Sequence, residues 1–166
     1  MALSKIQAES MNLADTYAFS GSVSGASVAG SNAFAARNSG TSWVAASANA
    51  IVVFDNDSTG DSFDTDSVFN TTTYKFTAPA TGVYTFWYGI YTANSDTDNA
   101  FTFYKNSASI DMSGSKFSHQ SNQNDDHMQT ATVIINLTIG NTISVHAQTG
   151  SDYYQGNVQW GGCRLA

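Results

Sequence analysis

The sequence predicts an all-β domain, and three features of its composition support that prediction. Aromatic residues make up 13% of the 166 residues, and aromatic and β-branched side chains fit a pleated sheet. Serine, asparagine and 13 glycines supply turns, whereas proline occurs once. Charged residues account for only 11% of the chain, whereas disordered chains usually combine strong charge with few aromatic residues. The body of the chain should therefore fold, and it should fold as strands.

The first half of the strand pattern ends at Pro79. Residues 33–37 form a candidate strand that stops at the turn Asn38-Ser39-Gly40. Residues 51–54 are a short apolar run, and residues 74–76 are another that leads into Pro79. Because proline lacks an N–H group, we expect it at a strand edge or in a turn.

The second half of the pattern begins with its strongest candidate, residues 83–91, in which Tyr84, Phe86 and Tyr88 share one face. The sequence Ile139-Gly140-Asn141 predicts a hairpin turn between two further strands. The remaining candidates are residues 101–104, 130–137, 142–147 and 153–165. The total of about eight strands is the number found in a jelly roll.

The charge balance excludes several classes of partner. Six Lys and Arg residues stand against 13 Asp and Glu residues, for a formal net charge of -7. Nucleic acid is not an expected partner, because lysine and arginine supply most of the affinity for phosphate backbones. No run of about 18 apolar residues and no secretory signal is readable, so no contact with a membrane is expected. Cys163 has no second cysteine to pair with, which suits synthesis in a reducing cytosol.

Catalytic signatures are missing from the sequence. It has no Gly-x-Ser-x-Gly elbow and no Walker loop, and Cys163 has no histidine near it in the sequence. We therefore expect a protein that is not an enzyme and that needs no cofactor, calcium being the one candidate.

Several short motifs resemble the complement C1q-like globular head, a relative of the tumour-necrosis-factor jelly roll. Ala33-Phe34-Ala35-Ala36-Arg37 resembles its opening strand, and Phe76-x5-Gly82-x-Tyr84-x-Phe86-x-Tyr88 follows the spacing of its aromatic signature. The resemblance covers about residues 32–166 and implies an antiparallel jelly-roll sandwich that forms a compact homotrimer. The residues expected at the trimer axis, or in the protomer's own core, are Phe34, Phe76, Tyr84, Phe86, Tyr88, Phe101 and Phe103.

An acidic loop departs from that family pattern, because Phe54 lies ten residues before Asp64 where about six are expected. The loop sequence Asp55-x-Asp57-x-Thr59-Gly60-x5-Asp66 is close to a twelve-residue calcium loop. The candidate ligands are Asp55, Asp57, Thr59, Asp61 and Asp66. A solvated acidic loop without metal is the alternative interpretation.

Residues 1–30 are expected to form an extended N-terminal arm before a head at residues 31–166. The arm ends in a Gly/Ser/Ala/Val run that cannot build a core and forms either a flexible linker or part of an arm that orders against a partner. The opening of the chain resembles those of tailed-phage structural proteins. These features predict a capsid decoration or cement protein, assembled in the host cytoplasm and located on the virion. The arm residues expected to dock on the major capsid protein, or on another virion protein, are Leu3, Ile6, Leu13, Tyr17 and Phe19.

A recognition module is the alternative function. A short fibre or knob would present a trimeric head to a glycan or receptor on the host surface. Exposed tryptophan and tyrosine side chains suit sugars, and the candidates are Trp87, Tyr153, Tyr154 and Trp160.

Overall fold

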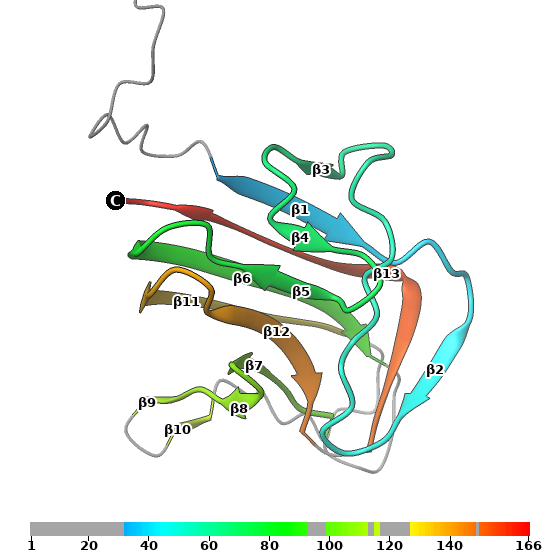
Figure 1. Ribbon diagram of the computed structural model, residues 1–166. Helices are drawn as coiled ribbons and strands as arrows, with labels where there is room; N and C mark the ends of the chain where they lie inside the picture. The colour runs from blue at the N-terminus through cyan, green and yellow to red at the C-terminus, as the bar shows by residue number, and fades with distance from the viewer. Residues whose placement is uncertain (1–31, 93–98, 113–114, 117–126, 149) are drawn as a thin grey trace, which may run out of the picture.

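The computed structural model describes residues 32–92, 99–112, 115–116, 127–148 and 150–166 (Figure 1). Two antiparallel sheets stack face to face, as predicted for a jelly-roll sandwich. The first sheet contains β11 (His127–Leu137), β6 (Gly82–Thr92), β13 (Ser151–Arg164), β1 (Ala33–Arg37) and β3 (Phe63–Asp64), with β2 (Trp43–Ala46) paired to β13. The second sheet contains β4 (Phe69–Asn70), β5 (Lys75–Thr77), β12 (Thr142–Ala147), β7 (Phe101–Lys105) and β8 (Ala108–Ser109). A separate pair is formed by β9 (Asp111–Met112) and β10 (Ser115–Lys116).

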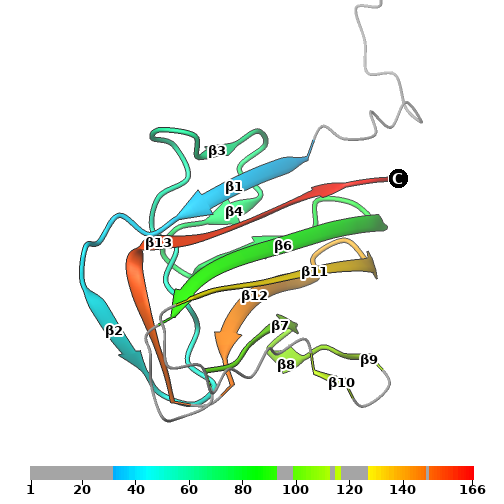
Figure 2. The ribbon, with the colours of Figure 1, turned by 180° about the vertical axis from the view of Figure 1, so that it is seen from behind.

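The strand β6 organises the first sheet. It pairs along all 11 of its residues with β11, from Gly82 opposite Leu137 to Thr92 opposite His127. On its other side it pairs with β13, which carries an irregularity between Tyr153 and Val158. This bulge bends β13, and its first residues, Ser151 to Tyr154, pair with β2 (Figure 2).

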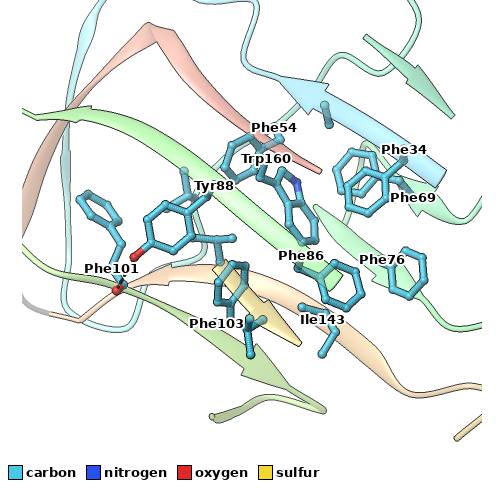
Figure 3. Close-up of a cluster of buried hydrophobic side chains, with 14 of the residues drawn as sticks. Phe34, Phe54, Phe69, Phe76, Phe86, Tyr88, Phe101, Phe103, Ile143 and Trp160 are labelled. Carbon is cyan, nitrogen blue, oxygen red and sulfur yellow. Dashed lines mark hydrogen bonds between the residues drawn. The ribbon is translucent and has the colours of Figure 1, made fainter. Parts of the chain in front are cut away.

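Aromatic side chains fill the space between the two sheets (Figure 3). The Phe34 ring lies edge-on to Trp160 with centroids 4.6 Å apart, and Phe76 meets Phe86 at 5.0 Å. The largest fully buried side chains are Trp160, Tyr84, Tyr88, Tyr153, Phe34, Phe54, Phe76, Phe86, Phe101, Phe103, Ile90 and Leu137. This core joins residues from both sheets, and its burial is the main favourable term in folding.

The predicted hairpin at residues 139–141 is wrong, because β11 and β12 belong to different sheets. Gly140 has φ of +83°, and its N–H donates to the carbonyl oxygen of Ala78 at 2.8 Å. The Ala78 N–H in turn donates to the Asn141 carbonyl at 2.8 Å. These bonds tie the connection to the chain beyond β5, where it crosses from one sheet to the other.

The early strands also differ from the prediction. Residues 51–54 form no strand, only an isolated bridge from Ile51 to His146, although Val52 and Phe54 are fully buried. The strand β2, at Trp43–Ala46, was not predicted. None of the described residues forms a helix of the length and hydropathy needed to span a membrane.

Candidate functional site

The aromatic residues expected at a trimer axis lie inside one protomer. Each of the seven is at most 2% exposed and belongs to the protomer's own core, the second of the two positions expected for it. The reason is that four of them come from the first sheet and three from the second, and the two sets face each other between the sheets, where no partner can reach them. The seven are Phe34, Phe76, Tyr84, Phe86, Tyr88, Phe101 and Phe103.

Two phenol hydroxyls in this core donate hydrogen bonds to backbone carbonyls. The hydroxyl of Tyr88 donates to the carbonyl of Phe101 at 2.9 Å, and that of Tyr84 donates to Ala80 at 2.8 Å. Burial raises the pKa of Tyr88 well above its usual range. These hydroxyls are therefore structural hydrogen-bond donors that join β6 to neighbouring segments.

The outward face of the first sheet is the exposed counterpart of this core (Figure 2). One cross-strand row places Thr85 between Ile134 and Cys163, and Ile134 is 61% exposed. The row continues to Ala33 of β1. Trp87 lies in the next row and is 36% exposed.

The second row is shaped around the Trp87 indole. Trp87 lies between Thr132 and Gly161, and Ala35 and Phe63 continue the row. A Cβ on Gly161 would lie 3.0 Å from the indole, so the glycine lets the ring pack against the strand. No side chain in these two rows carries a charge, and their members are Ile134, Thr85, Cys163, Ala33, Thr132, Trp87, Gly161, Ala35 and Phe63. We call these nine residues the outer rows.

Two of the four predicted glycan-binding residues cannot meet a ligand. Trp160 is fully buried, and Tyr153 is 1% exposed with its hydroxyl accepting a hydrogen bond from the Val53 N–H at 3.5 Å. Burial raises the pKa of Tyr153. The irregularity between Tyr153 and Val158 interrupts the two-residue alternation of β13, so that both side chains face the core, which corrects their assignment.

The other two residues reach the surface, at different places. Trp87 belongs to the outer rows, whereas Tyr154 is half-buried and pairs with Trp43 of β2. Trp43 is 46% exposed and also stacks on Tyr91, with centroids 5.9 Å apart and planes inclined by 30°. Trp43 and Tyr91 were missed because their neighbourhood depends on the bend of β13, which the sequence does not reveal.

The predicted calcium ligands are not brought together. Asp55 accepts hydrogen bonds from the Ser39 N–H at 2.8 Å and its hydroxyl at 3.0 Å, and Asp66 accepts one from the Asn32 amide at 2.8 Å. Within the described part of the chain, no three His, Cys, Asp or Glu side chains could hold a metal ion. The prediction of a site at Asp55, Asp57, Thr59, Asp61 and Asp66 is corrected accordingly, because the loop uses two of these carboxylates to attach itself to the segments around β1.

The side chain and backbone of Arg37 also hold this loop in place. The Arg37 guanidinium donates to the Thr59 hydroxyl at 3.3 Å and lies against Gly60, where a Cβ would come within 3.2 Å of it. The backbone of Arg37 also exchanges two hydrogen bonds with Asn56.

The predicted docking residues of the arm, Leu3, Ile6, Leu13, Tyr17 and Phe19, lie outside the described residues.

The comparisons with known proteins agree with this architecture. Residues 33–161 match the model of the C1q domain, and the chain belongs to the C1q domain family. Domains of this family are not enzymes, and C1q and tumour-necrosis-factor domains usually form homotrimers. No curated protein matches the sequence.

Solved structures show the same fold at low sequence identity. The globular domain of zebrafish complement 1qA protein superposes with a TM-score of 0.61 at 17% identity, over 81% of this chain and 98% of that one. Eiger TNF from S. frugiperda superposes with a TM-score of 0.56 at 18% identity, over 83% of this chain and 94% of that one.

Proposed function

We propose that the chain is a non-enzymatic head that forms a homotrimer through its outer rows. The observation that carries this proposal is the combination of exposure and neutrality in these nine residues, among which Ile134 is 61% exposed and no side chain is charged. Interfaces are depleted of charge at their centre and enriched in aromatic residues, and Trp87 supplies such a residue. The usual trimeric state of C1q domains supports the stoichiometry.

Light scattering of the full chain tests the association. We expect a mass three times the 17.6 kDa of one chain. Ile134→Glu and Trp87→Glu should each shift the protein to monomer, because an unpaired charge would be buried at the contact. Ile139→Glu is the matched control, since Ile139 is 65% exposed but lies outside the outer rows. A wild-type monomer would contradict the proposal.

The trimer, in this proposal, decorates the capsid of a tailed bacteriophage, to which residues 1–30 attach it. The low proportion of charged residues, 11% of the chain, supports a head whose solubility and contacts depend little on ion pairs, which salt would screen. Co-sedimentation with purified capsids tests the attachment. Deletion of residues 1–20 should abolish it, whereas Ile139→Glu should leave it unchanged. Retention of the truncated chain on capsids would contradict attachment through the arm.

A second function, recognition of a host surface glycan by the head, is favoured by a different observation. Trp43, Tyr91 and Tyr154 gather on the outside of the first sheet, beyond the outer rows. Reduced adsorption to host cells by Trp43→Ala, with unchanged attachment to capsids, would separate the two functions. Unchanged adsorption would contradict recognition through Trp43.

A further inference from the structure

We infer that Trp43, Tyr91 and Tyr154 form a stacking platform for a neutral saccharide, an inference that rests on the second proposed function. We call these three residues the aromatic platform. They come from three strands, with Trp43 on β2, Tyr91 at the end of β6 and Tyr154 on β13. Figure 2 shows this region where β13 bends towards β2, at the end of the sheet away from the C-terminus.

The platform is built by strand pairing. Tyr154 lies opposite Trp43 in the register of β13 and β2, and their ring centroids are 5.4 Å apart at an angle of 66°. Tyr91 also stacks on the indole, with ring centroids 5.9 Å apart. Trp43 keeps 46% of its surface exposed despite these contacts. A wide aromatic surface held by strands is thus available without any rearrangement of the backbone.

A cavity begins where the platform ends. It has a volume of about 210 Å³ and is lined by Arg37, Met128, Gly156, Asn157, Val158 and Gln159. Met128 is the strand partner of Tyr91, which joins one wall of the cavity to the platform. A Cβ on Gly156 would lie 3.0 Å from Cε1 of Tyr154, so this glycine keeps the edge between ring and cavity open.

The aromatic platform and the neighbouring cavity together offer the chemical groups that bind a sugar. The apolar face of a pyranose ring can stack on an indole, while its hydroxyl groups need nearby donors and acceptors. Asn157 and Gln159 each offer both an amide N–H and a carbonyl oxygen in the cavity. One aromatic surface beside two amides therefore provides the two kinds of contact that a saccharide requires.

The electrostatics favour a neutral sugar over an acidic one. Among the described residues that line the cavity, Arg37 alone carries a charge, and its guanidinium is already engaged with Thr59. The chain as a whole carries a formal charge of -7, which repels polyanionic glycans. A ligand without charge avoids this repulsion.

Binding of the full chain to a printed array of neutral and carboxylated glycans tests the inference. We expect retention of neutral glycans, and an about tenfold loss of affinity in Trp43→Ala, because the main aromatic contact is removed. Trp43→Phe should recover part of the binding, since it restores an aromatic ring. Ile139→Ala is the matched control, because Ile139 is 65% exposed but belongs to neither the aromatic platform nor the outer rows.

The outcomes separate the site from the function. Binding of neutral glycans that survives both Trp43→Ala and Tyr154→Ala would overturn the platform as the site while leaving glycan recognition intact. Retention of carboxylated glycans alone would overturn the neutral ligand class. Retention of no glycan would overturn both the inference and the second proposed function, without affecting trimer formation.

Discussion

The aromatic residues on the two faces of β6 differ in their exposure and therefore in their roles. Inward, Tyr84, Phe86 and Tyr88 are at most 2% exposed and meet the second sheet. Outward, Trp87 keeps 36% of its surface exposed, and Tyr91 supports Trp43. The same strand thus supplies residues that hold the fold together and residues that remain available to partners. The comparison shows that aromatic content alone does not identify an interface, because the covering sheet decides which side chains a partner can reach.

The largest expected effect separates the two faces by stability. Phe86→Ala should lower the free energy of unfolding by about 3–5 kcal/mol, because it leaves a cavity among Phe34, Phe76 and Trp160. Ile134→Ala, on the outward face, should cost less than about 0.5 kcal/mol in dilute protein. Urea denaturation at a low and a high protein concentration measures both. Equal losses at low concentration would break the comparison.

A second contrast uses two glycines of the same sheet. Gly162→Ala should destabilise the fold by about 1–3 kcal/mol, because a Cβ there would lie 2.6 Å from the Thr85 carbonyl oxygen and would also clash with the Phe86 ring. Gly89→Ala is the control, since the nearest atom to its Cβ would be 3.5 Å away. Thermal unfolding of both variants tests this, and a lower melting temperature for Gly89→Ala than for Gly162→Ala would contradict it.

A smaller effect tests the buried hydroxyls. Tyr88→Phe should cost about 1–2 kcal/mol, because the carbonyl of Phe101 loses its 2.9 Å donor in a buried setting. The same change on the half-buried Tyr154 should cost less, since water can replace a lost contact there. Chemical denaturation compares the free energies of unfolding of the two variants. A Tyr88→Phe variant with the free energy of unfolding of the wild type would show that the hydroxyl does not contribute to stability.

The smallest expected effect concerns a histidine outside the core. The pKa of His146 is lowered by burial, with a further contribution from Lys75, although the hydrogen bond with the Asn49 carbonyl opposes the shift. The unfolded chain therefore binds a proton at higher pH than the folded chain. Stability should be complete above about pH 6.5 and should fall as the pH drops through that value, until His146 titrates in the folded state.

Unfolding measured from pH 8 to pH 5 tests this dependence, with His146→Gln as the comparison. The variant should lose part of the pH dependence in this window. If the free energy of unfolding changes with pH to the same extent in the wild type and the variant, the pH dependence arises from groups other than His146.

The class of fold could be predicted because it depends on local patterns. Alternating aromatics in residues 83–91 fixed both the strand and its inward face, and β6 confirms them. The C1q resemblance also held, since its motif encodes that same alternation. The prediction of a hairpin at residues 139–141 was wrong, because a glycine turn between two apolar runs has the same sequence pattern whether the two strands pair or enter different sheets.

The sequence by itself determined that this protein is an all-β domain with an aromatic core, because strand periodicity is a property of neighbouring residues. Only the tertiary structure decided which aromatics a partner can reach. Tyr153 and Tyr154 are adjacent in the chain, yet one is buried and the other borders Trp43. The bulge in β13 and its pairing with β2 assemble the aromatic platform from residues more than 40 positions apart. Long-range pairing of this kind leaves no local mark that a single sequence could show.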